Sequence, residues 1–152
     1  MTELDLSQNT ALESLDCSIN ELKQLNVSGC TALKKLSCSS NQLTTLDVSK
    51  NTNLIKLECS SNLLAVLDVS NNPKLEDLSC DYNSLTLLDL RKNPELEILS
   101  CRKNGLTSLD LDANKKIGEK ILYLENQFYH KGVLNAGETF DMKTLPGSFD
   151  PS

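Results

Sequence analysis

Residues 12–27 read Leu-Glu-Ser-Leu-Asp-Cys-Ser-Ile-Asn-Glu-Leu-Lys-Gln-Leu-Asn-Val, and this stretch decides the fold because its pattern returns along the chain. The pattern L-x-x-L-x-C-x-x-N-x-L-x-x-L-x-[VL] begins again at Leu33, Leu54, Leu75 and Leu96, with a constant step of 21 residues. Self-similarity at a short fixed period is typical of a solenoid, in which each repeat forms one coil that stacks on its neighbours. The sequence therefore predicts a solenoid, which builds extended surfaces more readily than enclosed catalytic pockets.

Each coil contains two similar halves, one with L-x-x-L-x-C-x-x-N and the other with L-x-x-L-x-[VL]-x-x-N. In both halves apolar and polar residues alternate around a central leucine, which is the period of a half-buried strand. Stacking would then give two short-stranded parallel sheets that face each other across a core of Leu, Val and Cys. Because two strands and two turns fill the 21 residues, we expect a β-rich, right-handed solenoid with little or no helix.

Five cysteines take the same place in successive coils, and this column has three interpretations. A tetrahedral metal site needs four thiolates that converge on one ion, whereas a row spaced by the strand separation of about 4.8 Å does not converge. Disulfides fit that spacing, but parallel side chains suit the bond poorly and an odd number leaves one unpaired. The favoured interpretation is a structural ladder of buried free thiols. The column is Cys17, Cys38, Cys59, Cys80 and Cys101.

Asparagines form two further columns, one in each turn of the coil. Asn side chains bond neighbouring backbone groups and tolerate turn conformations, so a stacked row can satisfy the amides of buried loops. Cys30 interrupts the second column, and we expect its turn to be looser and its thiol to be the most reactive one. The first column is Asn20, Asn41, Asn62, Asn83 and Asn104, and the second is Asn9, Asn51, Asn72, Asn93 and Asn114.

A fourth column is acidic and lies on the polar side of the second half of each coil. One interpretation is a calcium ribbon, but calcium takes about six to eight oxygen ligands, and each coil offers one Asp with flanking Ser or Thr. The preferred interpretation is a solvated acidic face, with no metal and no cofactor. The column is Asp5, Asn26, Asp47, Asp68, Asp89 and Asp110.

The regular array is predicted to span residues 1–116, as half a coil followed by five complete coils. Because the chain begins in mid-coil, we expect Met1 to be a fragment start. At Ile117 the register slips and the next matches come one residue late, so residues 117–152 are predicted to form a degenerate cap and a truncated tail. Weak strand character is predicted at residues 139–142. The aromatic rings that would cover the core end are Tyr123, Phe128, Tyr129, Phe140 and Phe149.

Composition narrows the functional classes. The formal charge is −6 and the cations are scattered, whereas nucleic-acid binding needs clustered basic residues that release counterions. No apolar stretch reaches the length of a membrane span, about 20 residues, and the N-terminus lacks an export pattern. His130 is the single histidine and has no nucleophile or orienting acid beside it in the sequence. We therefore expect a protein that is not an enzyme and binds no nucleic acid.

The double phrase L-x-x-L-x-C-x-x-N-x-L-x-x-L-D-[VL]-x-x-N resembles the short, 21-residue leucine-rich repeats of bacterial surface and secreted proteins, broadly internalin-like. The resemblance covers residues 4–116. The tail from Thr139 to Ser152 is similar to a segment that follows such repeats in Gram-positive surface proteins. The resemblance implies a leucine-rich repeat protein that is extracellular or wall-associated in its parent and binds a partner, but it does not identify the ligand.

Comparison of the coils indicates where a partner would bind. On the outward side of the cysteine-bearing sheet, the first three coils carry mostly serine beyond the cysteine, whereas the fourth and fifth carry charged and aromatic residues. Tyr and Arg are enriched among binding hot spots, which favours a protein or glycan partner at this place. The predicted ligand-binding residues are Lys35, Lys56, Glu58, Asp81, Tyr82, Arg102 and Lys103.

Two alternatives remain open for this surface. Its variation can be ordinary drift in an array that is held together by its core. The chain can also be a structural spacer or stalk segment of a larger surface protein. The sequence identifies neither the partner, nor the sheet face that binds, nor the oligomeric state.

Overall fold

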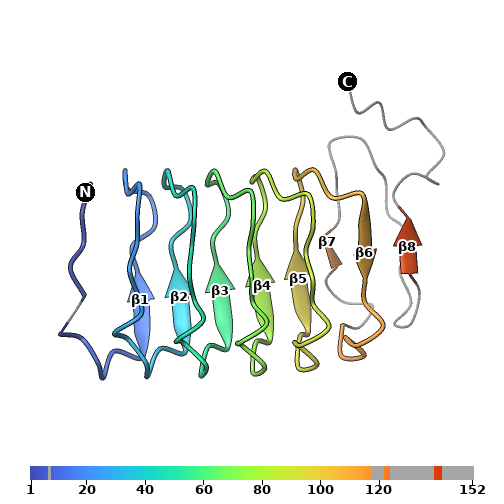
Figure 1. Cartoon of the computed structure of the whole chain (residues 1–152), viewed down its shortest axis with the longest axis horizontal. Coiled ribbons are helices and arrows are strands. Elements are labelled where there is room, and N and C mark those ends of the chain that lie inside the picture. Colours follow the sequence, from blue (N-terminus) through green and yellow to red (C-terminus); the bar gives the residue numbers. More distant parts are fainter. Residues whose placement is uncertain (7, 118–121, 124–138, 142–152) are drawn as a thin grey trace.

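The computed structural model describes residues 1–6, 8–117, 122–123 and 139–141. These residues contain short strands and no helix, and the strands follow one another along a solenoid (Figure 1), so the predicted β-rich solenoid is confirmed. The strands are β1 (Ser14–Asp16), β2 (Lys35–Ser37), β3 (Lys56–Glu58), β4 (Asp77–Ser79), β5 (Ile98–Ser100), β6 (Ser108–Asp110), β7 (Leu122–Tyr123) and β8 (Thr139–Asp141).

Strands β1 to β5 come from successive coils and form one parallel sheet with β7, in the order β1-β2-β3-β4-β5-β7. We term it the cysteine-bearing sheet. Leu15 pairs with Leu36, and Leu36 pairs with Leu57, so the pairing advances by one 21-residue repeat at each coil. Because side chains alternate along a strand, the central leucine of each strand points into the coil and its two neighbours face outward.

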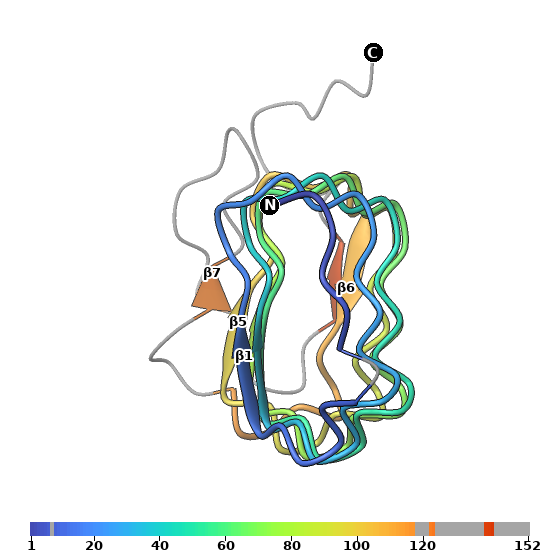
Figure 2. The same cartoon turned by 90° about the vertical axis from the view of Figure 1, so that its left-hand side faces the viewer.

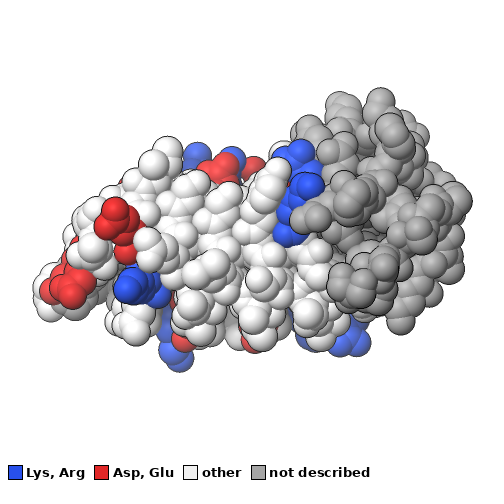
Figure 3. Space-filling view, turned by 90° about the horizontal axis from the view of Figure 1, so that it is seen from above, with Lys and Arg blue, Asp and Glu red and all other residues white. Residues whose placement is uncertain are grey.

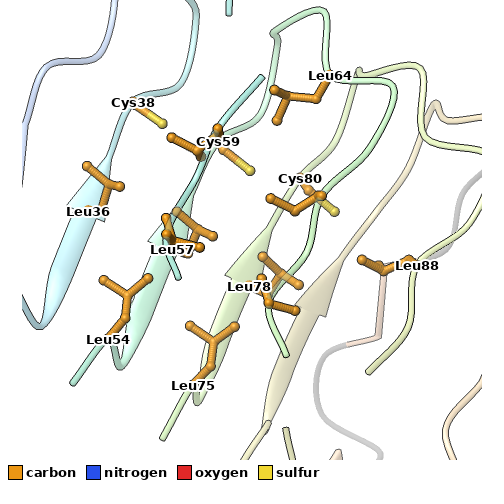
Figure 4. Close-up of a cluster of buried hydrophobic side chains, with 14 of the residues drawn as sticks. Leu36, Cys38, Leu54, Leu57, Cys59, Leu64, Leu75, Leu78, Cys80 and Leu88 are labelled. Atoms are coloured by element: carbon orange, nitrogen blue, oxygen red, sulfur yellow. The ribbon is translucent and has the colours of Figure 1, made fainter. Parts of the chain in front are cut away.

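The core is a ladder of leucines and cysteines that repeats once per coil (Figure 4). Leu57 and Leu78, at the centres of β3 and β4, have no exposed surface. Full burial of a leucine side chain contributes about 1.5–3 kcal/mol relative to leaving it exposed. Cys59 and Cys80 lie beyond these leucines on the same side of the sheet (Figure 4). The buried side chains of both halves form a single cluster that runs along the array.

The second half of each coil does not form the second parallel sheet that the sequence predicted. Within the described ranges it is a strand only at β6, whose partner β8 runs antiparallel. In this half the side chains of the acidic column bond the backbone of their own turns, and Asp110 of β6 does so too. Asp47 accepts a hydrogen bond from the Ser49 backbone at 2.9 Å, and Asp68 accepts one from the Ser70 backbone at 2.9 Å. Such local turns compete with hydrogen bonds between coils.

Beyond β5 the register slips by two residues, and the predicted slip of one residue is wrong. Leu99 pairs with Leu122 and Ser100 pairs with Tyr123, so the partners are 23 residues apart instead of 21. A slip of one residue would have paired Leu99 with Ile121 instead of Leu122. The backbone register therefore places Tyr123 at the position of Ser100 and not at that of the cysteine.

Strand β8 confirms the strand character predicted at residues 139–142, and its pairing sets Phe140 opposite Leu109 of β6. Figure 2 looks along the solenoid and shows β6 on the side of the coil opposite β1 and β5. The chain path therefore encloses a narrow core between the cysteine-bearing sheet and the second halves. Most of the predicted cap and tail, including His130 and Phe149, lies outside the described residues.

Candidate functional site

After each cysteine the chain turns away from the sheet through a residue with a left-handed backbone. The φ angles at this position lie between 52° and 57°, although none of the residues is glycine. This conformation costs roughly 1–2 kcal/mol for a residue with a Cβ atom, and it is a genuine outlier for a β-branched residue. We term these residues, at the upper rim of the sheet in Figure 1, the left-handed column. They are Ile19, Ser40, Ser61, Tyr82 and Lys103.

Asp81 and Arg102 form an ion pair between the fourth and fifth coils. The guanidinium places Nη2 3.0 Å and Nε 3.2 Å from Oδ2 of Asp81. The carboxylate also accepts hydrogen bonds from the Arg102 backbone at 2.6 Å and from the Ser100 hydroxyl at 2.7 Å. Asp81 is only 6% exposed, and a buried carboxylate is tolerated only with partners of this kind. The geometry therefore gives Asp81 the role of positioning the guanidinium.

Tyr82 and Lys103 lie beside this ion pair on neighbouring coils of the left-handed column. Tyr82 is 55% exposed, and its backbone N–H donates to the Arg102 carbonyl at 2.8 Å. A tyrosine held in this way offers contact area with few torsions to fix. Figure 3 looks down on this rim and shows basic side chains next to the grey segment, beside a largely uncharged band. We term Tyr82, Arg102 and Lys103 the rim cluster.

The remaining predicted site residues lie on β2 and β3, along the middle of the sheet. Lys56 Nζ lies 2.9 Å from Glu58 and 3.0 Å from Asp77, so it ties β3 to β4. The hydrogen bonds to these two carboxylates raise the pKa of Lys56. Burial alone would raise the pKa of Glu58, but hydrogen bonds from the Ser37 hydroxyl and Lys56 outweigh it and lower the pKa. Lys35 is exposed and pairs in register with Lys56.

The structure thus divides the predicted site in two. It brings the rim cluster together above Asp81, and it places Lys56 and Glu58 in a separate ionic network. Sequence reasoning missed Ile19, which is 85% exposed at the other end of the left-handed column. The available signal was an apolar residue at a position where the next two coils carry Ser40 and Ser61.

The environment of the cysteine column does not favour reactive thiolates in the folded chain. All six cysteines are free and buried. Burial raises the pKa of Cys59 and Cys101 to about 12, and it raises the pKa of Cys38 further. The thiolate, which is the nucleophile and the metal ligand, is therefore scarce at neutral pH. Across the described part of the chain, no three His, Cys, Asp or Glu side chains are grouped to hold a metal ion.

Cys30 has no exposed surface, and burial raises the pKa of its thiol, so its environment does not favour reactivity. The prediction of a looser turn is wrong. Its N–H donates to the Val27 carbonyl at 2.9 Å, as the N–H of Asn51 does to Val48 at 3.0 Å. What changes is the side chain. Asn51 Nδ2 donates to the Val27 and Cys30 carbonyls of the coil before it, at 3.0 and 2.8 Å. The Cys30 thiol, in contrast, lies 4.0 Å from the Leu6 carbonyl.

The two asparagine columns differ in how completely their side chains are bonded. In the first column, Asn62 donates to the Cys38 and Cys59 carbonyls at 3.0 and 3.1 Å, and its Oδ1 accepts from the Leu43 N–H at 3.0 Å. In the second column the amides also donate to carbonyls, but the Oδ1 atoms are buried without a hydrogen-bond partner. An unsatisfied buried acceptor costs about 1–3 kcal/mol. The four residues concerned are Asn51, Asn72, Asn93 and Asn114.

The acidic column acts as a row of turn caps. Asp89 accepts hydrogen bonds from the side chain and backbone of Arg91, which lower the pKa of Asp89 to about 2. Hydrogen bonds from Ser49 and Ser70 likewise lower the pKa values of Asp47 and Asp68. These carboxylates are exposed and charged at neutral pH.

Comparison with known proteins supports the fold. No protein-family profile matches the sequence, and no curated protein does. The functional domain of InlJ from Listeria monocytogenes, which includes a cysteine ladder, is 35% identical with a TM-score of 0.66 over 83% of this chain and 32% of that chain. An internalin, InlF, from the same species is 21% identical with a TM-score of 0.76 over 80% and 36%. A leucine-rich repeat protein of Leptospira interrogans is 24% identical with a TM-score of 0.69 over 80% and 33%.

These similarities and the repeating coil define a leucine-rich repeat protein. Within that class the chain is internalin-like. The chain spans about a third of the length of each of these three solved chains. The described residues contain no helix that could cross a membrane.

Proposed function

We propose that this chain is a non-enzymatic protein-binding module of a bacterial surface or secreted protein, and that it binds through the rim cluster. The internalin-like fold supports a role in protein interaction. The observation that carries the proposal is the ion pair at 3.0 Å between Arg102 and the buried Asp81, directly beside an exposed tyrosine. Side chains that are fixed before binding lose less entropy when a partner docks.

The serine-bearing coils show that stacking does not require this arrangement. At the position of Asp81 and Arg102, the second and third coils carry Ser39 and Ser60. The Ser39 hydroxyl accepts from the Ser60 N–H at 3.1 Å, and the Ser60 hydroxyl accepts from the Asp81 N–H at 3.1 Å. Serine therefore satisfies the backbone of the next coil. A buried carboxylate and an arginine add nothing that a spacer or stalk would need, which favours the binding role over that alternative.

The test is a variant that restores the serine coil, Asp81→Ser with Tyr82→Ser and Arg102→Ser. Each substitution introduces the residue found at the same position in the third coil, so the fold should be retained, as checked by circular dichroism. Immobilised wild-type chain should retain a defined protein from a surface-protein extract, and the variant should bind it at least about tenfold more weakly, the effect expected for hot-spot loss. The matched control is Glu76→Gln with Glu97→Gln, two exposed carboxylates away from the rim cluster.

Equal retention by the wild-type chain and the serine-coil variant would contradict the rim cluster as the binding site. Retention of no protein at all would favour the spacer. A glycan array probed with the same two proteins distinguishes the partner class, because a glycan ligand would bind the wild-type chain there and leave the protein extract unretained.

A further inference from the structure

Large apolar side chains are exposed along the second halves of the third and fourth coils, and one more is exposed in the turn that leads into the second half of the third coil. Leu63, Val66 and Leu87 are 57%, 72% and 68% exposed. Val66 and Leu87 occupy the same position in adjacent coils, which are joined at the start of these halves by a hydrogen bond from the Ser84 N–H to the Leu64 carbonyl at 2.8 Å. Leu63 precedes Val66 by three residues in the same coil. We term these three residues the apolar patch.

The apolar patch is confined to these two coils. The second coil carries Gln42 and Thr45 where the third carries Leu63 and Val66, and the fifth carries Ser108 where the fourth carries Leu87. Other coils of the same fold therefore carry polar residues at these outward positions. Adjacent exposed aliphatic side chains are unfavourable in water, and contiguous patches of this kind mark interaction sites.

The acidic column runs along one side of the apolar patch. Asp68 and Asp89 follow Val66 and Leu87 by two residues, and burial alternates between them, so these four side chains share the outward side of the coil. Asp89 is bonded by Arg91, whereas the Asp68 carboxylate is bonded by the Ser70 N–H and carries no ion pair in the described structure. The face therefore combines exposed aliphatic groups with a row of negative charge.

We propose that the apolar patch and the acidic column form a second docking surface, for an amphipathic segment of a partner protein that presents aliphatic side chains beside Lys or Arg. Apolar contact would supply affinity, and charge complementarity would set orientation and association rate. Val66 and Leu87 are separate from the rim cluster, since they occupy the register position of Ser108 in β6, which lies on the side of the coil opposite β1 and β5 (Figure 2). A second copy of this chain is a poor occupant, because its net charge of −6 and its own acidic column would repel this face.

The probes are synthetic peptides added to the full chain and followed by fluorescence anisotropy. One is an amphipathic Leu/Lys peptide, the second replaces its Lys by Glu, and the third has the same Leu/Lys composition in a scrambled, non-amphipathic order. The patch variant is Leu63→Gln with Val66→Thr and Leu87→Ser, which takes its residues from the second and fifth coils. Each of these residues is already accepted at its position by the array.

A second variant, Asp47→Asn with Asp68→Asn and Asp89→Asn, removes charge and keeps the turns. Asn26 already stands in this column, and its side chain accepts the Ser28 N–H at 3.0 Å. The charge-matched control removes three exposed carboxylates elsewhere and is Glu21→Gln with Glu76→Gln and Glu97→Gln.

The wild-type chain should bind the amphipathic Leu/Lys peptide at least about tenfold more tightly than either other peptide, and the patch variant should lose that advantage. The Asn variant should bind more weakly and with less dependence on salt, while the charge-matched control keeps the wild-type affinity. The proposal is overturned if the patch variant binds as the wild-type chain does, or if the scrambled and amphipathic peptides bind equally. Sedimentation that shows a dimer lost only in the patch variant would also overturn it, because the occupant would be a second copy.

Discussion

The two halves of each coil carry nearly the same sequence phrase but are held together differently. In the cysteine-bearing half, backbone groups bond from coil to coil, as from Cys38 to the Glu58 carbonyl and from Cys59 to the Ser79 carbonyl, both at 2.8 Å. In the opposite half of the third coil, the backbone N–H groups of residues 65–68 make no hydrogen bond to a neighbouring coil within the described structure. The comparison teaches that leucine spacing sets the path of the coil in both halves, whereas a sheet forms only where the backbone groups of neighbouring coils bond each other.

This difference also separates the two proposed surfaces. The rim cluster ends a hydrogen-bonded sheet, and its tyrosine and arginine are fixed by the backbone and by Asp81. In the apolar patch, Leu63 is bonded by its backbone to the Leu43 carbonyl at 2.9 Å, whereas Val66 lies on extended chain that is held by the buried side chains of Leu64 and Leu67. We therefore expect the first surface to be rigid and the second to adapt to its partner.

The largest expected effect compares core leucines of the two halves. Leu57→Ala should lower the free energy of unfolding by about 2–5 kcal/mol, because a rigid sheet cannot close over the cavity. Leu67→Ala removes the same atoms from the opposite half and should cost less, because chain without a ladder can relax. Urea denaturation of both variants measures the difference. A larger loss for Leu67→Ala would break the comparison.

The asparagine columns give the next effect. Asn62→Ala leaves the Leu43 N–H without a partner and should cost about 2–4 kcal/mol. The Cys38 and Cys59 carbonyls each lose one of two Asn donors and keep the amide of the neighbouring coil. Asn72→Ala removes one of two donors from the Val48 and Asn51 carbonyls and also removes an unsatisfied Oδ1, so a smaller loss of about 1–2 kcal/mol is expected. Thermal and urea unfolding check both values, with each melt followed by circular dichroism. Equal losses would mean that the missing partner of Oδ1 does not matter.

A stabilising change is expected in the left-handed column. Ile19→Gly relieves a backbone strain of roughly 1–2 kcal/mol, less about 0.5–1 kcal/mol for the greater freedom of glycine in the unfolded chain. Because the Ile19 side chain is exposed, little packing is lost, and the melting temperature should rise slightly. Ile19→Ala keeps the strain and serves as the control. A fall in stability with glycine would show that the exposed side chain is held by contacts that matter.

The smallest expected effect is on the stability of the chain at low pH. The carboxyls of Asp47, Asp68 and Asp89 have pKa values below 3.8, with Asp89 at about 2. The contribution of these carboxylates to folding stability is complete above their pKa in the unfolded chain. It is lost as the pH falls through the lowered pKa values of the folded chain, between about pH 4 and pH 2. Urea midpoints measured across this window should fall less steeply for the triple Asn variant than for the wild-type chain. Parallel curves would contradict the role of these carboxylates as turn caps.

Much of the fold could be predicted because one leucine period satisfies both the core and the strand. Leu36 and Leu57 are buried where the alternation requires. The second sheet could not be predicted, since alternation describes extended chain whether or not neighbouring coils bond. The slip after β5 could not be predicted in size, because two extra residues stand between Ile117 and Leu122 and the repeat pattern does not fix the length of that segment.

The candidate site was predicted by position but not by role. Drift among the coils pointed to Asp81 and Arg102, but burial of the carboxylate depends on the Ser100 hydroxyl and a backbone N–H from the next coil. The left-handed column carried no signal of its own, because glycine, the usual residue at such φ angles, is absent from it. The 21-residue alignment puts Ile19 and Tyr82 in one outward column, but it could not show that their backbone is left-handed.

Amide hydrogen exchange, resolved residue by residue by NMR, tests most directly the claim that residues 65–68 of the opposite half lack the backbone hydrogen bonds between coils that the cysteine-bearing half has. The amides of Cys38, Cys59 and Cys80 should exchange only with global unfolding, because each donates to the next coil at 2.8 Å. The amides of Val66 and Leu67 should exchange faster, through local opening. Equal protection in the two halves would contradict the account, since it would require a second set of hydrogen bonds between coils.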